Sequence, residues 1–165
     1  MTCLLRNLLL LGLLGPAVAL AAPPAGEITV RADQATFRQQ EGLGVYQGNA
    51  ELRQGNRQIN ADRIELRLSD GAFSRAEATG NPVQLREGDI LDARGQVLVY
   101  DVASQTITLT GDAYIRHEGR TFEGARVVYD LGSRNVEASG DGEGQRVRLV
   151  IPAQDSGEST ARPEE

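Results

Sequence analysis

The sequence contains no tryptophan and no lysine, and it has a single cysteine, Cys3, and a single histidine, His117. Cys3 precedes an apolar N-terminal run, and no other cysteine follows it. The rest of the chain therefore cannot form an internal disulfide. The aromatic residues are limited to three Phe and four Tyr. Because aromatic side chains usually dominate tightly packed cores, we expect an interior of Ile, Leu and Val, which suits a slim open-ended groove better than a thick core.

The charge balance is acidic. All 17 basic residues are arginines, and 23 acidic residues bring the net charge to −6. This balance argues against bulk electrostatic attraction to nucleic acid or to an anionic membrane surface, so no nucleic-acid partner is predicted. An anionic ligand would have to be held by apolar contacts and a few well-placed charges.

Common catalytic and cofactor motifs are missing: the sequence has no Gly-x-Ser-x-Gly, no P-loop and no dinucleotide-binding fingerprint. His117 lies beside a predicted turn at Gly119, where we expect it to be solvent-exposed and without a role. Without a second histidine, no metal site is predicted. Most carboxylates fall at turn positions, where Asp caps the local backbone. We therefore predict a protein that is not an enzyme and needs no cofactor.

The first 22 residues have the organisation of a secretory signal peptide. Arg6 supplies a positive charge, residues 8–14 form an apolar run, and a small-residue pattern at positions 19–21 predicts cleavage after Ala21 or Ala22. An uncleaved anchor is the alternative, but the apolar run is shorter than the roughly 20 residues that span a bilayer. At the other end, residues 153–165 are polar and acidic, and they predict a disordered tail.

A dipeptide signature repeats along the region between these ends. It occurs as Gly48-Asn49, Gly80-Asn81, Gly111-Asp112 and Gly140-Asp141, at intervals of 32, 31 and 29 residues. A fixed period of about 30 residues indicates a repeat architecture. We expect each pair to form a turn that opens one copy of the repeat, and the stretch 111–130 to be one hairpin with turns at Gly111 and Gly119.

Apolar and polar residues alternate with period two through most of the chain, and residues 63–68 show this most clearly. Ile64, Leu66 and Leu68 fall on one face of a strand, which a helix would not allow. No segment shows a helical pattern. We predict one all-β domain over residues 23–152. Its expected form is a single elongated, open-ended, twisted antiparallel β-jelly roll of repeats of about 30 residues, with a two-sheet sandwich as the alternative.

The inward positions of these strands form an apolar stripe, and residues alone leave two interpretations of it open. It is either an ordinary dry core or, in part, a groove for an apolar ligand. Residues 146–151 are expected to close the fold, with Val147, Leu149 and Ile151 facing inward. An open-ended stack also leaves unpaired edge strands, which can pair with another subunit.

Three stretches carry a resemblance to a known family: ITVRADQATF at 28–37, YQGNAELRQGNRQINADRIEL at 46–66 and LTGDAYIRHEGRTFEGARVVYDL at 109–131. Over roughly residues 27–151 the chain resembles the OstA-like family of periplasmic lipopolysaccharide-transport proteins. This resemblance implies a β-jelly roll open at both ends, whose interior accepts the acyl chains of lipid A. It also implies a bridge that carries lipopolysaccharide across the periplasm, from the inner to the outer membrane.

The resemblance favours the groove over the dry core and implies which residues take part. Family positions that contact ligand correspond to Ile28, Val30, Leu85, Tyr100 and Val102. Together with the inward stripe, the predicted acyl groove comprises Ile28, Val30, Leu52, Ile64, Leu66, Leu85, Leu98, Tyr100, Val102, Ile107, Leu109, Ile115 and Phe122.

The partner-facing edges implied by the resemblance lie at the two ends of the domain. They comprise Ile28, Thr29, Val30 and Arg31 at one end and Val147, Leu149 and Ile151 at the other. The implied partners are an inner-membrane-anchored transport component at the N-terminal edge and the periplasmic domain of an outer-membrane translocon at the C-terminal edge. Head-to-tail homo-oligomers are a further possibility. Two other functions stay open: a membrane-anchored adaptor of the same fold, and a structural repeat protein without a lipid ligand.

Overall fold

The computed structural model describes residues 26–142 and 144–152. The predicted signal peptide with its cleavage site, and the predicted acidic tail, lie outside the described residues. Within this part of the chain, ten strands form one sheet in which the paired neighbours are antiparallel. The elements are β1 (Ile28–Arg31), β2 (Gln34–Arg38), the 3₁₀ turn η1 (Gln39–Glu41), β3 (Leu43–Gln54), β4 (Arg57–Ser69), β5 (Ala72–Glu87), β6 (Leu91–Asp101), β7 (Thr106–His117), β8 (Arg120–Asp130), β9 (Val136–Ser139) and β10 (Arg148–Val150).

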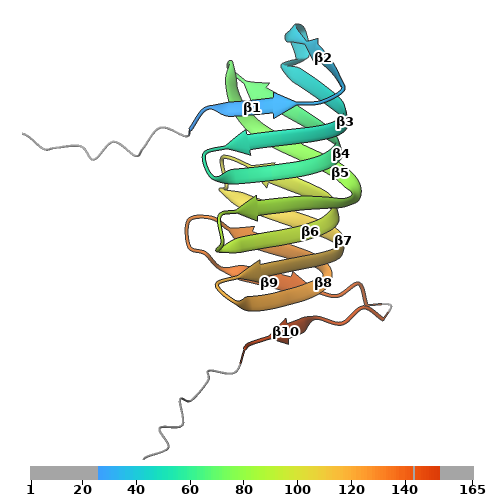
Figure 1. Cartoon of the computed structure of the whole chain (residues 1–165), viewed down its shortest axis with the longest axis vertical. Coiled ribbons are helices and arrows are strands. Elements are labelled where there is room, and N and C mark those ends of the chain that lie inside the picture. Colours follow the sequence, from blue (N-terminus) through green and yellow to red (C-terminus); the bar gives the residue numbers. More distant parts are fainter. Residues whose placement is uncertain (1–25, 143, 153–165) are drawn as a thin grey trace, which may run out of the picture.

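The six long strands β3–β8 pair in sequence order as consecutive hairpins, which gives the stack in Figure 1. The short strands sit at its two ends. One half of β3 pairs with β2 and the other half with β1. In the same way, β8 pairs with β10 through one half and with β9 through the other. Each long strand therefore belongs to two halves of the sheet.

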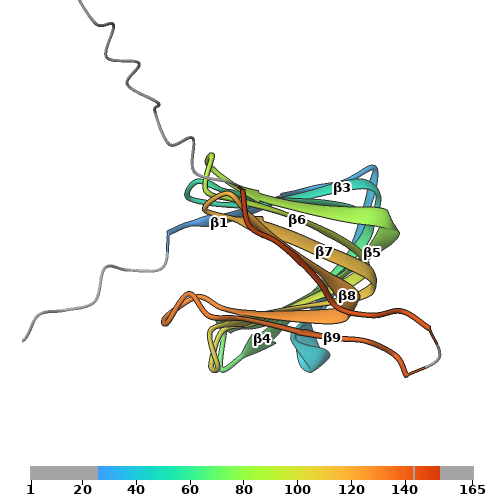
Figure 2. The ribbon, with the colours of Figure 1, turned by 90° about the horizontal axis from the view of Figure 1, so that it is seen from below.

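The two halves are folded over each other as two layers. We call the half that contains β1 and β10 the first layer and the half that contains β2 and β9 the second layer. Figure 2 shows them in profile: the strands bend along one side of the molecule and end in facing rows of hairpin loops on the other. We call this second side the mouth. The fold is the predicted all-β architecture, and its form is consistent with a jelly roll.

The repeated Gly-Asn and Gly-Asp pairs do not form hairpin turns, so that prediction was wrong. Gly48-Asn49, Gly80-Asn81 and Gly111-Asp112 lie inside β3, β5 and β7, at the register shifts where these strands bend. Both residues of the third pair have positive φ, 77° at Gly111 and 47° at Asp112. Two consecutive left-handed residues bend the strand without reversing it, and pairing resumes beyond them. Gly140-Asp141 follows β9 and lies outside the long strands.

The hairpin turns lie elsewhere, and the turn predicted at Gly119 is among them. Gly119, with φ of 80°, connects β7 to β8 at the mouth, as expected. The period of about 30 residues therefore corresponds to one complete hairpin of two long strands. Every second strand carries the glycine pair at its bend.

The core lies between the two layers. The predicted alternation in β4 is confirmed, because Ile64 and Leu66 are buried whereas Arg67 is exposed. Small residues line the inner face next to the bends, where the layers converge: Ala50, Ala78 and Ala113 are buried beside register shifts. Larger buried side chains lie beside the register shifts too, among them Ile64, Leu98 and Leu109.

Candidate functional site

The inner faces of both layers form one continuous apolar surface. The structure brings together the residues that were predicted to line a groove. Nine of them are buried: Leu52, Ile64, Leu66, Leu85, Leu98, Tyr100, Ile107, Leu109 and Ile115. The other four are half-buried and pack against the same cluster: Ile28, Val30, Val102 and Phe122. Which of these side chains contact a ligand stays a prediction.

Sequence reasoning missed part of this surface. The buried residues that were not predicted include Ile59, Val83, Leu91, Val127 and Tyr129. In β4, Ile59 and Ile64 are both buried although they are five positions apart, which a strict period of two forbids. The register shift between Asn60 and Arg63 changes the parity of the inward positions. Reading each half-strand separately on either side of its bend would have recovered these residues.

The mouth of the first layer carries a row of four aligned residues. Arg57 pairs with Glu87, Glu87 with Leu91, and Leu91 with His117, on four successive strands. The row begins and ends with a side chain that can carry positive charge. Because residues paired in this way share one face of the sheet, all four project toward the second layer or its rim.

The mouth of the second layer carries a matching row. Tyr100 pairs with Ile107, and Ile107 pairs with Tyr129. All three are buried, although the strands that hold them end within one or two residues. They are buried because the first layer covers them. Each row therefore has polar or aromatic residues at its two ends. Between them lie Glu87 and the apolar Leu91 in the first row, and the apolar Ile107 in the second.

Two contacts join these rows across the mouth. The guanidinium carbon of Arg57 lies 5.4 Å from the ring centroid of Tyr100, within the range of a cation–π interaction. Farther along the mouth, on β7 and β8, the Tyr129 hydroxyl lies 3.3 Å from Nε2 of His117, and the two ring centroids are 5.1 Å apart. We call Arg57–Tyr100 and His117–Tyr129 the mouth pairs.

Charge at the mouth is partly neutralised within the first layer. Arg57 donates hydrogen bonds from Nε and Nη2 to Oε2 of Glu87, at 3.0 and 2.8 Å. The two side chains are only 14% and 21% exposed, so this is a half-buried ion pair. Burial raises the pKa of Tyr129 above its ordinary value, and the negative charge of Glu87 raises it further. The neutral phenol is therefore favoured at the mouth.

His117 is not the exposed turn residue that the sequence predicted. It ends β7 on the inner face and is only 8% exposed. The prediction failed because the neighbouring glycine indicated a turn but not which face the last strand residue occupies. The pairing of Leu91 with His117 places the imidazole on the inner face, beneath the second layer.

The two ends of the stack carry the predicted partner edges. In the described part of the chain, β1 pairs with β3 alone and β10 with β8 alone, so each keeps one unpaired edge. Leu149 lies on the inner face as predicted, because it pairs with Phe122, which in turn pairs with the buried Ile115. Val147 and Ile151 flank β10. Val147, Leu149 and Ile151 are nevertheless 47%, 50% and 65% exposed, because β10 is the last strand of the sheet and pairs with β8 at only three positions.

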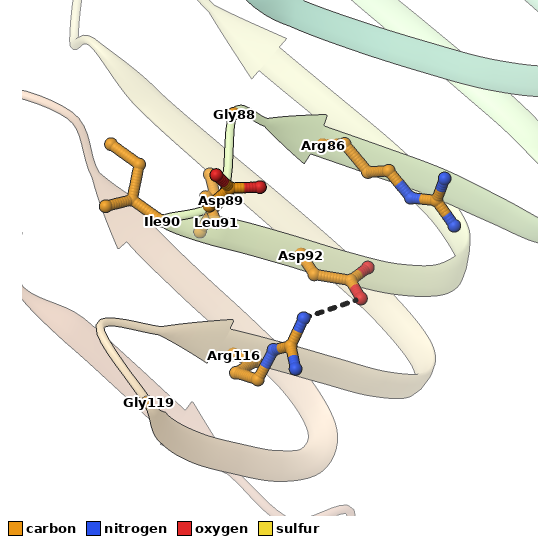
Figure 3. Close-up of a pocket in the computed structure, with 8 residues that line it drawn as sticks. All are labelled: Arg86, Gly88, Asp89, Ile90, Leu91, Asp92, Arg116 and Gly119. Carbon is orange, nitrogen blue, oxygen red and sulfur yellow. Dashed lines mark ion pairs between the residues drawn. The ribbon is translucent and has the colours of Figure 1, made fainter.

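A polar hollow of about 480 Å³ lies on the outer side of the first layer, beside the β5–β6 and β7–β8 hairpins. Its charged lining includes Arg86, Asp89, Asp92 and Arg116, and Figure 3 shows the ion pair of Arg116 with Asp92, at 3.5 Å. Charges of both signs are mixed there, so the hollow does not favour an anion or a cation. Of the residues that line it, Leu91 alone belongs to the hydrophobic core cluster.

Neither metal-binding nor membrane-spanning features are found in residues 26–142 and 144–152. Over those residues, no three His, Cys, Asp or Glu side chains are grouped closely enough to hold a metal ion. No helix in the same ranges has the length and apolar character needed to cross a membrane.

Comparison with known proteins gives concordant matches. The chain is 30% identical over 147 residues to the lipopolysaccharide export system protein LptH of Pseudomonas aeruginosa, a match that covers 84% of this chain and 83% of LptH. It is 26% identical over 146 residues to the lipopolysaccharide export system protein LptA of Escherichia coli K12, covering 84% and 78%.

A solved structure matches the fold as well. The crystal structure of LptH, described as the LptA-homologous periplasmic component of the conserved lipopolysaccharide transport device of P. aeruginosa, superposes with a TM-score of 0.71 at 26% identity. The match covers 78% of this chain and 96% of that one. A family model described as LptA/(LptD N-terminal domain) LPS transport protein matches residues 29–135. The expected family resemblance is therefore confirmed, and the chain belongs to this LptA/LptD N-terminal domain family of lipopolysaccharide transport proteins.

Proposed function

We propose that this protein is a periplasmic carrier that binds lipopolysaccharide and passes it from the inner toward the outer membrane. The observation that carries the proposal is the continuous apolar surface between two layers of one sheet, in a member of a lipopolysaccharide-transport family. The related LptH is described as a periplasmic component of a lipopolysaccharide transport device. The role is transport, and we assign no reaction to the chain.

The apolar interior suits acyl chains better than it suits a charged ligand. Each methylene that leaves water gains about 0.8 kcal/mol, so several acyl chains supply enough free energy without charge attraction. The net charge of −6 is then compatible with an anionic lipid. The acyl chains lie between the layers, and the phosphorylated sugars remain at the mouth, where water and polar side chains are available. The thirteen predicted groove residues are the proposed acyl contacts.

The exposed edges of the sheet suit end-to-end assembly. β1 offers an unpaired edge to an inner-membrane-anchored transport component, and β10 offers one to the periplasmic domain of an outer-membrane translocon. Pairing of β10 with β1 of another copy would join the apolar interiors of successive subunits. Backbone hydrogen bonds across such a junction provide affinity with little demand on side chains.

Site-specific photo-crosslinking tests the proposal. A photo-reactive amino acid is placed at Tyr100 or Ile28, on the inner face, and at Arg67, an exposed position of β4. Purified protein is mixed with lipopolysaccharide and irradiated. We expect labelling at the first two positions and none at Arg67. Labelling confined to Arg67, or no retention of lipopolysaccharide by any variant, would rule out the proposed function.

A further inference from the structure

The mouth pairs differ from the other polar and aromatic side-chain contacts described within β3–β8 because they connect residues of opposite layers. Arg57 belongs to the first layer and Tyr100 to the second, and the same holds for His117 and Tyr129. Within each layer, strands are already held by a ladder of backbone hydrogen bonds. The mouth pairs add nothing to these ladders. They can therefore separate without breaking any strand pairing.

A third contact lies just outside them. Arg134, beyond the end of β8, donates a hydrogen bond from Nη1 to Oε1 of Glu118, in the β7–β8 hairpin, at 3.5 Å. Both side chains are largely exposed, so this contact is readily exchanged with water. The Arg134–Glu118 contact lies beyond the mouth pairs, on their solvent side. The three contacts that join the layers at the mouth are thus all polar or aromatic, and each is individually weak.

Apolar residues occupy the positions between the mouth pairs. Leu91 pairs with Glu87 on one side and with His117 on the other, and Ile107 lies between Tyr100 and Tyr129. Both are buried. Parting the layers at the mouth would expose this apolar surface to water, unless another apolar group takes its place. An acyl chain is such a group.

We propose that the mouth pairs form a reversible clasp, and that lipid acyl chains enter the interior sideways by parting it. This inference rests on the proposed function and adds the route of loading. In the closed clasp, the Arg57–Tyr100 and His117–Tyr129 contacts cover the apolar interior. In the open clasp, the same polar groups line the mouth and face the sugar and phosphate groups of the lipid. Entry through the open ends of the stack is the opposing route.

A removable covalent bridge across the mouth tests the clasp. In the full chain carrying Cys3→Ser, the substitutions His117→Cys and Tyr129→Cys are joined with a short, cleavable thiol-reactive linker. Loading is followed as the uptake of fluorescently labelled lipopolysaccharide. We expect the bridge to slow uptake about tenfold or more, because the layers can no longer part, and cleavage of the linker to restore the rate.

The matched control is a bridge within one layer. Arg94 and Tyr114 are paired residues of β6 and β7, and the Arg94 guanidinium carbon lies 4.1 Å from the Tyr114 ring centroid. Bridging Arg94→Cys to Tyr114→Cys should leave the uptake rate unchanged. As a second test, the loosened variant Arg57→Gln with Tyr129→Phe should load faster than the unmodified protein while its circular dichroism spectrum is unchanged.

The outcomes separate the two proposals. If the unbridged protein retains no lipopolysaccharide, the proposed function fails. If it binds, but the bridged protein loads at the same rate, only the clasp is overturned and the acyl chains enter through the ends. Slowed uptake that cleavage does not restore would also count against the clasp, since the substitutions and not the bridge would then limit loading.

Discussion

The hydroxyl oxygen of Tyr129 lies 3.3 Å from Nε2 of His117, although the two residues belong to opposite layers of the folded sheet. His117 ends β7 and Tyr129 is the penultimate residue of β8, so each stands within two residues of a hairpin loop. Both are nevertheless buried. The bends in the long strands bring the two layers together and cover these side chains. The contact between these two side chains therefore forms only when the mouth is closed.

The ionisation of Tyr129 should reveal this closure. Its pKa is raised above 10.0, first by burial and then by the charge of Glu87. The neutral phenol consequently stabilises the fold below pH 10.0, and that contribution is lost as pH rises through the higher folded-state pKa. Phenolate absorbance of the protein, minus that of Tyr129→Phe, should show a group that titrates above 10.0. A difference curve with its midpoint at or below that value would contradict the buried contact.

The ion pair of Arg57 with Glu87 should contribute more stability than exposed pairs do. Its side chains are 14% and 21% exposed, and one guanidinium donates two hydrogen bonds to one carboxylate oxygen. Arg57→Ala leaves the Glu87 carboxylate half-buried and unpaired, so we expect a loss of about 1–2 kcal/mol in the free energy of unfolding. Urea denaturation measures it.

The pair Asp92–Arg116 is the control for this prediction. Its side chains are 39% and 53% exposed, so removing Arg116 should change the free energy of unfolding by less than about 1 kcal/mol. Equal losses in the free energy of unfolding for Arg57→Ala and Arg116→Ala would show that partial burial does not strengthen the ion pair at the mouth. A double-mutant cycle with Glu87→Ala then isolates the coupling between the two partners of the buried pair.

Two glycines with nearly equal backbone angles should respond differently to alanine. Gly111, at the bend of β7, has φ of 77°, and Gly71, in the β4–β5 hairpin, has φ of 76°. An added Cβ at Gly111 would lie 2.7 Å from Oε1 and 2.9 Å from Cβ of Gln96, whereas nothing lies within 4 Å at Gly71. Gly71→Ala should cost about 1–2 kcal/mol from the left-handed backbone alone. Gly111→Ala should cost about 2–4 kcal/mol, since overpacking adds to that strain.

Thermal or urea denaturation of the two variants measures this difference. Their matched φ values make the comparison specific to packing at the bend. If Gly111→Ala were no more destabilising than Gly71→Ala, the bends would have to be looser than the close approach to Gln96 indicates.

The repeated Asp-x-x-Ser turns should make stability depend on acid pH. The backbone N–H of Ser104 donates to Asp101 at 2.9 Å, and that of Ser133 donates to Asp130 at 2.7 Å. These backbone hydrogen bonds lower the pKa of both carboxyls below 3.8, and hydrogen bonds from the serine hydroxyls are the second cause. The stability they contribute is therefore present above pH 3.8 and lost as pH falls through the lower folded-state values.

The variant Asp101→Ala with Asp130→Ala tests this dependence. At pH 7 it should unfold at a lower urea concentration than the unmodified protein, and the difference should shrink below pH 3.8. A difference that is constant from pH 7 to pH 3 would show that the carboxylate charge does not matter. In that case the turns would depend on backbone geometry alone.

The sequence alone determined the class of the fold, the repeat and the composition of the interior. Alternation of period two in segments such as 63–68 indicates strands, and glycine pairs at intervals of about 30 residues indicate a repeat architecture. These features are local, since each depends on the order of side chains along one strand. The family resemblance also came from short stretches of sequence.

Only the tertiary structure decided what the glycine pairs do and where the mouth lies. A Gly-Asp dipeptide is compatible with a hairpin turn or with a bend, and the choice depends on whether pairing resumes with the same neighbour, as it does for β7 with β8 beyond Gly111. The bends bring together His117 and Tyr129 from opposite layers. No local pattern encodes such a contact, because it depends on how far the whole sheet folds over itself. Sequence therefore determined the strands, and long-range folding of the sheet determined the site.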